Sequence, residues 1–325
     1  MIKPENALQN SIPYKLVKND PTLCEWLFTG VNNFNKPFFL DSISECKQLK
    51  ENSTRFKCIA QTKMLPLWSS ALEANPDPSA IIFHISRCGS TLVSQLLDIK
   101  KEHMVLSEVP FFDELLRLPF KDNQIGPDET AGYFKAAVQL YTNSPNEIPS
   151  DVFIKTDSWH LYYYAQLRKM YPETPFILLY RHPWEVILSQ QRRRGMQSVP
   201  GILEPTLFGF TETQAAEYDM DKYMANVLFS YFTKMIEITT ADPLALPVNY
   251  AEGAIPILKK IYAAAGINFD TATQKEMEQR TGFHGKYPEQ QFKEENIHSD
   301  MPSFMQPITE LYFILDKLNN SADQE

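Results

Sequence analysis

Short apolar runs alternate with longer segments of helical periodicity from residue 80 onward. A short apolar run bounded by turn residues is typical of a strand buried on both faces, and apolar positions repeated every three or four residues predict a helix. Five such alternations predict an α/β fold, a parallel sheet flanked by helices. The expected strands are 80–85, 104–108, 151–156, 175–180 and 246–250, and the helices that follow them are 92–97, 110–118, 159–170, 183–194 and 255–265.

Proline and polar residues cluster at 74–78, where we expect a boundary. This boundary separates an N-terminal accessory region, residues 1–79, from an α/β domain over residues 80–325. The aromatic pieces of the accessory region are expected to pack on the main core. Gly195 and Gly266 each follow a helical pattern, so we expect both to be left-handed C-terminal caps.

The composition bounds the class of protein. With 325 residues, 43% of them hydrophobic, the chain can bury a large core, which excludes disorder of the bulk. The apolar runs are far shorter than the roughly 20 residues of a membrane helix, and the first ten residues lack the apolar core of a signal peptide. We therefore expect a soluble cytoplasmic protein without a membrane span. A formal charge of -9 argues against a nucleic-acid partner.

The cysteines and histidines give no sign of a metal or of disulfides. Cys24, Cys46, Cys58 and Cys88 lie far apart with no C-x-x-C pair, so we expect reduced thiols. The six histidines show no spacing typical of metal ligands. No metal is therefore expected.

The stretch FHISRCGSTLVSQLL, residues 83–97, combines the first strand, a tight turn and the start of a helix. Backbone N–H groups and the helix dipole favour a phosphate or sulfate in such a turn. Gly89 lets the backbone come close to an anion, and the hydroxyls of Ser90 and Thr91 add donors. The stretch therefore predicts an anion-binding loop, although a helix cap beside an exposed arginine is the alternative.

This loop differs from the loop that binds nucleoside triphosphates. The G-x-x-x-x-G-K-[ST] pattern requires glycine at 84 and lysine at 90, where this chain has His84 and Ser90. The cation stands instead at Arg87, two residues before the glycine. A cation there can reach the bridging oxygen of a transferred group.

A second basic stretch, YRHPWEVILSQQRRR, follows the fourth expected strand. Arg181 stands at the end of the strand, and Ser189 and Arg193 lie on the next helix. Guanidinium groups match the geometry of phosphate, so these residues are candidates to bind a second dianion. A solvated helix end with basic residues at the dipole is the alternative.

Together the two stretches resemble the nucleotide-binding elements of sulfotransferases that use 3'-phosphoadenosine 5'-phosphosulfate (PAPS). The first, with Cys88 where that family has serine or alanine, resembles its 5'-phosphosulfate loop. The second is similar to its 3'-phosphate element, in which an arginine and a serine stand eight residues apart. The resemblance implies PAPS as co-substrate. Arg87 in the first loop makes the chain more similar to the tyrosylprotein and carbohydrate branch.

The resemblance to that branch also implies roles for three further residues. Glu108, at the end of the second strand, matches the general base. Lys155, after the third strand, matches a lysine that stabilises charge, and Arg87 joins these two as the third catalytic residue. Tyr250 is similar to the tyrosine that stacks on adenine, although the family's Tyr-Glu-Asp-Leu is Tyr-Ala-Glu-Gly here.

The implied reaction moves a sulfuryl group to a hydroxyl or amine, without a metal. Two alternatives stay open: a non-catalytic protein that binds the nucleotide, and an atypical P-loop kinase. The acceptor is open among small molecules, saccharides, lipids and peptides, and so is the oligomeric state. Glycines and prolines among apolar residues at 195–215 predict a mobile lid over the acceptor site. Polar and aromatic residues at 211–240 predict one or two inserted helices.

Overall fold

The computed structural model describes residues 10–72, 77–121, 125–143, 148–282 and 300–322. Its contacts divide the chain into two units. The first unit consists of Met1–Ser79, Leu97–Lys155 and Ala165–Pro172, and the second of Ala80–Leu96, Thr156–Tyr164 and Glu173–Glu325. The predicted boundary at residue 79 stays a prediction.

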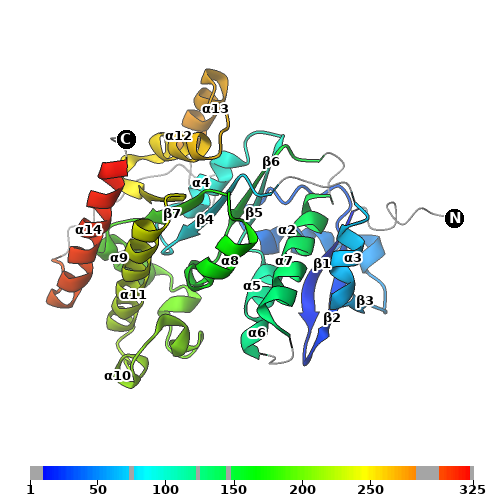
Figure 1. The fold of residues 1–325 in the computed structure, drawn as a ribbon, viewed down its shortest axis with the longest axis horizontal. Coiled ribbons are helices and arrows are strands. Elements are labelled where there is room, and N and C mark those ends of the chain that lie inside the picture. The colour runs from blue at the N-terminus through cyan, green and yellow to red at the C-terminus, as the bar shows by residue number, and fades with distance from the viewer. Residues whose placement is uncertain (1–9, 73–76, 122–124, 144–147, 283–299, 323–325) are drawn as a thin grey trace. The chain divides into compact units, whose positions relative to one another are not determined.

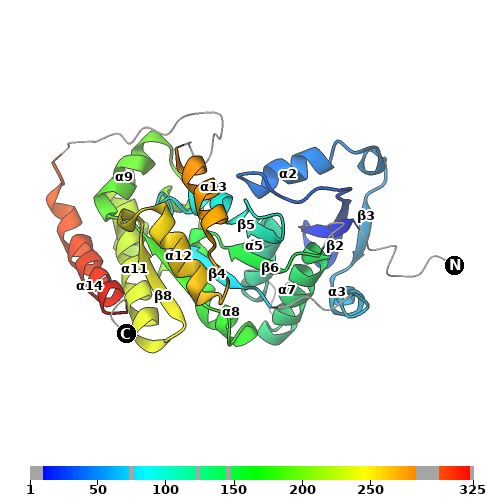
Figure 2. The same cartoon turned by 90° about the horizontal axis from the view of Figure 1, so that it is seen from above.

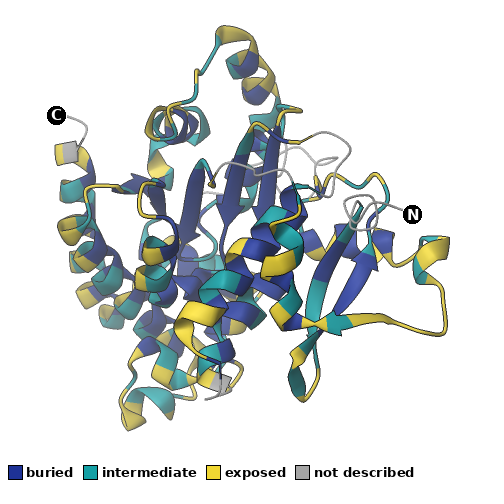
Figure 3. Ribbon diagram, turned by 45° about the vertical axis from the view of Figure 1, so that its right-hand side comes forward, coloured by how far each residue is buried: buried dark blue, intermediate teal, exposed yellow. Residues whose placement is uncertain are grey.

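A five-stranded parallel sheet with flanking helices confirms the predicted α/β fold (Figure 1). Its strand order is β5-β6-β4-β7-β8. Nearly every strand residue is buried, which explains the continuous apolar runs (Figure 3). The strands are β4 (Ala80–His84), β5 (His103–Ser107), β6 (Asp151–Lys155), β7 (Phe176–Tyr180) and β8 (Ala245–Asn249).

The first unit holds β5, β6 and a second, antiparallel sheet of order β1-β2-β3 that the sequence patterns do not predict. The strand β1 packs on the helices that follow β5, since the Leu16 N–H donates to the Glu114 carboxylate at 2.5 Å. The Tyr141 hydroxyl likewise donates to the Pro13 carbonyl at 2.7 Å. The elements of this unit besides β5 and β6 are β1 (Ser11–Val17), β2 (Asp20–Phe28), α2 (Phe39–Cys46), η1 (Lys50–Asn52), β3 (Cys58–Gln61), η2 (Thr62–Met64), α3 (Leu65–Ser69), α5 (Pro110–Leu116), α6 (Leu118–Lys121), α7 (Pro127–Thr142) and most of α8 (Tyr164–Met170).

The second unit holds β4, β7 and β8. Parallel pairing aligns Ile81 with Phe176, and Phe176 with Ala245. The long helix α11 packs beside α14 (Figures 1 and 2). Besides its strands the unit contains α4 (Ser90–Leu97), η3 (Ser158–Tyr163), α9 (Pro183–Arg192), η4 (Met196–Ser198), η5 (Pro205–Phe208), α10 (Glu212–Ala215), α11 (Met220–Ala241), η6 (Tyr250–Glu252), α12 (Ala254–Ala264), α13 (Thr271–Thr281), η7 (Ser303–Met305) and α14 (Gln306–Ala322).

Local signals in the sequence explain where several helices begin and end. The inserted helices α10 and α11 confirm the prediction for 211–240, and the Asp219 side chain caps α11 by accepting the N–H groups of Asp221 and Lys222. Gly266 has a φ of 68°, as predicted for a left-handed cap after α12. The prediction for Gly195 is wrong, because its φ is -86° and α9 already ends at Arg192.

Candidate active site

The turn after β4 has an unusual backbone. Ser86 and Arg87 both lie in the left-handed region, with φ of 65° and 53°, and Gly89 follows with φ of 80°. This region is unfavourable for residues other than glycine, so contacts with neighbouring groups must stabilise the turn. Helix α4 begins directly after it at Ser90, which places Ser90 and Thr91 in the first helical turn. The predicted anion loop is therefore a preformed turn before a helix.

Two side chains attach this turn to β7 and to the end of α9. The buried Cys88 thiol lies 3.5 Å from the Leu179 carbonyl of β7. The Arg87 guanidinium donates to the Arg193 carbonyl, just beyond the end of α9. Arg193 itself is exposed, and its N–H lies 3.4 Å from the Ser189 carbonyl. The structure thus brings the two basic stretches of the sequence together.

Three of the predicted nucleotide-binding residues meet within the second unit. A Cβ atom on Gly89 would lie 2.0 Å from the Tyr250 ring, so only glycine fits beside it. The Arg181 guanidinium lies 4.9 Å from the centroid of the same ring. Gly89, Arg181 and Tyr250 follow β4, β7 and β8 respectively. The ends of three neighbouring strands therefore supply a tight loop, a cation and an aromatic face.

The prediction for Arg181 missed a competing partner. Glu185, one helical turn further on, accepts a hydrogen bond from the Arg181 Nε and forms an ion pair with it. The i,i+4 spacing of the two residues was the available signal. An anion bound at Arg181 has to share this guanidinium with Glu185 or displace it.

Glu108 and Lys155 form an ion pair in the first unit. The sequence predicts both as catalytic residues but does not predict their contact. The Lys155 Nζ lies 2.8 Å from the Glu108 Oε1, and the Lys155 side chain is 1% exposed. The Glu108 side chain is 32% exposed, so solvent or a ligand can reach it. Glu108 is left-handed, with φ of 51°, and its N–H donates to the Lys155 carbonyl at 2.7 Å. The backbone and the side chain of Glu108 are thus both held by Lys155.

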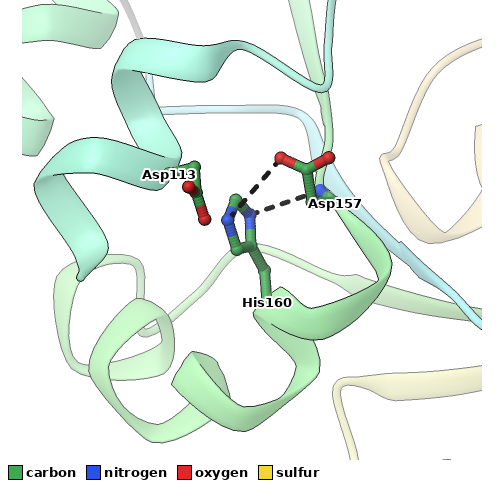
Figure 4. Close-up of side chains that lie close together, drawn as sticks. All are labelled: Asp113, Asp157 and His160. Carbon is green, nitrogen blue, oxygen red and sulfur yellow. Dashed lines mark hydrogen bonds and ion pairs between the residues drawn. The ribbon is translucent and has the colours of Figure 1, made fainter. Parts of the chain in front are cut away.

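Two buried histidines near strand ends, His160 after β6 and His84 in β4, are engaged in local contacts. The Asp157 N–H donates to the His160 Nδ1 at 3.2 Å, and the His160 Nε2 lies 3.7 Å from the Asp157 carboxylate (Figure 4). The pair closes the first turn of η3. The His84 Nε2 lies 2.9 Å from the Thr156 carbonyl. Both rings are buried and hold turns in place.

A cavity of about 500 Å³ lies between the predicted lid and α11. Part of the predicted lid contributes residues 206–210, and α11 contributes Phe229, Ser230 and Lys234. The Tyr162 hydroxyl donates to Ser230 at 2.6 Å, and the Ser230 hydroxyl donates to the Phe208 carbonyl at 2.8 Å. These bonds attach 206–210 to α11, and the mobility of the lid stays a prediction.

The structure also bears on the predictions of reduced cysteines and of no membrane span. All four cysteines are free thiols. Among the helices of the described ranges, none combines the length and the apolar character that a membrane span requires.

No family model matches this chain, and no curated protein matches it. The chain is similar to solved structures of sulfotransferases. One from Mycobacterium avium is 14% identical over 74% of this chain and 77% of that chain, with a TM-score of 0.48. One from Alicyclobacillus acidocaldarius is 12% identical over 76% and 95%, with a TM-score of 0.44. A mouse sulfotransferase complexed with PAP is 14% identical over 80% and 90%, with a TM-score of 0.39. These likenesses are distant, so function has to be judged from this chain's own residues.

Proposed function

We propose that the protein is a sulfotransferase that uses PAPS. The observation that carries the proposal is the meeting of Gly89, Arg181 and Tyr250 after three neighbouring strands. A preformed turn at a helix start suits one anionic group, and a guanidinium suits another. An aromatic ring between them suits a base. This combination suits a nucleotide with charged groups at two ends.

Each candidate residue has a role in this proposal. The turn after β4 holds the 5'-phosphosulfate, residues on α9 and beside its two ends hold the 3'-phosphate, and the ring after β8 stacks on adenine. The residues are, in that order, Arg87, Cys88, Gly89, Ser90 and Thr91; Arg181, Ser189 and Arg193; and Tyr250.

Glu108 and Lys155 carry the transfer step. The acceptor hydroxyl or amine attacks the sulfur and gives its proton to Glu108, while the bond from sulfur to the 5'-phosphate oxygen breaks. Lys155 and Arg87 stabilise the charge on the sulfonate and on the leaving oxygen. The products are the sulfated acceptor and adenosine 3',5'-bisphosphate. No step of this scheme needs a metal.

Two finer assignments belong to the same proposal. The arginine of the first loop, the strand-end glutamate and the lysine favour the tyrosylprotein and carbohydrate branch. Residues 80–325 are the catalytic domain, with 1–79 as its accessory region. The acceptor is a hydroxyl or amine of a small molecule, saccharide, lipid or peptide.

Calorimetry with two nucleotides tests the proposal. The protein should bind adenosine 3',5'-bisphosphate much more tightly than AMP, because AMP lacks the 3'-phosphate. Arg181→Ala should weaken binding of the bisphosphate about tenfold or more, since a charge-assisted contact is worth about 1.5–3 kcal/mol. Arg192→Ala, at the exposed last residue of α9, is the control and should change little. Equal affinity for the two nucleotides would contradict the proposal.

A turnover assay separates the enzyme from its alternatives. PAPS with a labelled sulfuryl group is offered to phenols, saccharides, lipid alcohols and tyrosine peptides. Transfer to one class supports the enzyme and names its acceptor. Binding of the bisphosphate without transfer to any class would favour a non-catalytic binder. Stabilisation by ATP with magnesium, but not by the bisphosphate, would favour a kinase.

A further inference from the structure

Ser86 stands at the start of the left-handed turn yet is not glycine. A non-glycine residue with a φ of 65° is disfavoured, and in an unsupported loop it returns to an ordinary conformation. Two buried side chains of the second unit contact Ser86, and neither is among the predicted nucleotide-binding residues. They are His84, which is 4% exposed, and Gln190, which is 0% exposed.

His84 holds the backbone of Ser86. The Ser86 N–H donates to the His84 Nδ1 at 3.0 Å, so this nitrogen acts as an acceptor. The other nitrogen, Nε2, lies 2.9 Å from the Thr156 carbonyl and therefore carries the proton. Thr156 is itself held against β4, because its N–H donates to the Ile82 carbonyl at 3.0 Å. The neutral ring thus connects Ser86 to a fixed point on the sheet.

Gln190 holds the side chain of Ser86 from α9. Its Nε2 donates to the Ser86 Oγ at 3.3 Å, and its Oε1 accepts the Gly195 N–H at 2.8 Å. A buried amide is stable only where both its ends find partners. The side chain therefore joins the turn after β4 to the first residue of the predicted lid.

We infer that His84 and Gln190 are positioning residues that clamp Ser86 in its left-handed conformation and so present the loop from Arg87 to Thr91 to its anion. They act on the backbone of the loop and not on the ligand. The identity of the ligand, adenosine 3',5'-bisphosphate, rests on the proposed function. The rival explanation is that the Ser86 hydroxyl contacts the nucleotide directly.

Two substitutions of Ser86 separate these explanations. Ser86→Ala and Ser86→Gly both remove the hydroxyl, but only glycine adopts the left-handed conformation without support. The clamp predicts that Ser86→Ala weakens binding of the bisphosphate roughly tenfold while Ser86→Gly leaves it within about threefold. A direct contact of the hydroxyl predicts equal losses, and equal losses would overturn the inference.

The same logic applies to the two clamping side chains. Gln190→Leu should weaken binding about tenfold, and adding Ser86→Gly should restore most of the loss, which makes the pair non-additive. Gln191→Leu is the matched control, since the neighbouring Gln191 is exposed and bonds Asp221 instead. Losses that simply add in the Gln190 and Ser86 double variant would contradict a shared role.

Amide hydrogen exchange without nucleotide gives a second measurement that does not depend on the proposed function. NMR should find the Ser86 amide protected in the wild type and exchanging at least about tenfold faster in His84→Phe, which keeps the ring but removes its acceptor. If the wild type fails to bind the bisphosphate but this protection behaves as expected, the proposed function fails and the clamp stands. If His84→Phe leaves the protection unchanged, the clamp is wrong.

Discussion

The turns that follow β4 and β5 share one feature and differ in how it is held. Each contains a left-handed residue other than glycine, Ser86 with Arg87 after β4 and Glu108 after β5. After β4 the support comes from side chains of other residues, His84 and Gln190. After β5 the support comes from Lys155. Its backbone carbonyl accepts a hydrogen bond from the Glu108 N–H, and its Nζ forms an ion pair with the Glu108 carboxylate.

We infer from this difference that the turns after β4 and β5 have different roles in the proposed function. In the turn after β4, side chains fix the backbone, and a fixed backbone suits recognition of an anion. In the turn after β5, the backbone and a lysine fix a carboxylate, and a fixed carboxylate suits proton transfer. Substitutions that change the backbone of the turn after β4 should therefore change nucleotide affinity. Substitutions that remove a charge from the turn after β5 or from Lys155 should change turnover instead.

The largest effect is expected from Glu108→Gln, which keeps the shape of the side chain and removes the proton acceptor. Transfer should slow by roughly a hundredfold or more while affinity for the bisphosphate stays nearly unchanged. Lys155→Ala should behave similarly through lost charge stabilisation. The thermal stability of both variants must also be measured, because each substitution breaks the ion pair of the buried Lys155 and can destabilise the fold.

Glu102→Gln is the matched control for this experiment. Glu102 lies just before β5, its side chain is 55% exposed, and its partner is Lys100. It should leave turnover unchanged. Near-normal turnover of Glu108→Gln on the true acceptor would exclude Glu108 as the base. The two turns would then no longer differ in their roles in binding and in turnover.

A smaller but specific effect is expected from Gly89→Ala in the turn after β4. The new methyl group would lie 2.0 Å from the Tyr250 ring, so the loop or the ring must move. Affinity for the bisphosphate should fall on the order of thirtyfold, because the proposed function has both elements hold the nucleotide. Calorimetry measures the loss, and turnover at saturating nucleotide should change much less.

Gly201→Ala isolates the backbone strain of this substitution. Gly201 has the same φ of 80° as Gly89, but nothing lies within 4 Å of its Cβ position. It should cost some stability, of the order of 1 kcal/mol, and leave nucleotide affinity unchanged. An equal loss of affinity in the two variants would mean that contact with Tyr250 is irrelevant.

The parallel sheet could be predicted from the sequence because its strands are buried on both faces and so read as continuous apolar runs. The antiparallel sheet of the first unit gives no such run. The pairing of β1 with β2 shifts register between Pro13 and Lys15 and again between Leu16 and Val17, which breaks any alternation. The sequence patterns therefore predict no strand or helix within residues 10–72.

The candidate site could be predicted only one residue at a time. Strand ends and the family resemblance named Glu108 and Lys155, but their contact depends on the register that aligns Ser107 with Lys155. No local pattern fixes that register. The left-handed backbone could not be predicted either. Glycine and asparagine are the residues that indicate this conformation, and the positions that adopt it here are Ser86, Arg87 and Glu108.

Asp98 is a carboxylate for which the described residues offer no compensating cation, and it extends the comparison with Glu108. Asp98 directly follows α4, and burial raises its pKa to about 7. No opposing charge among the described residues offsets that rise. Glu108, in the same unit, has Lys155 at 2.8 Å. The two carboxylates differ in whether a cation compensates for burial.

The smallest expected effect is that of Asp98→Asn on stability. Since the pKa of Asp98 is higher in the folded protein than its usual 3.8, the folded state binds more protons between about pH 4 and 7, and stability falls as pH rises through that window. Asparagine carries no charge, so the variant should gain about 1 kcal/mol over the wild type between pH 5 and pH 8, less than the full shift implies because the side chain is partly exposed. Urea unfolding at the two pH values measures the gain. Asp128→Asn, at an exposed carboxylate whose pKa Lys169 lowers, should show no such gain. An advantage of Asp98→Asn that is the same at both pH values would mean that burial of the charge is not its cause.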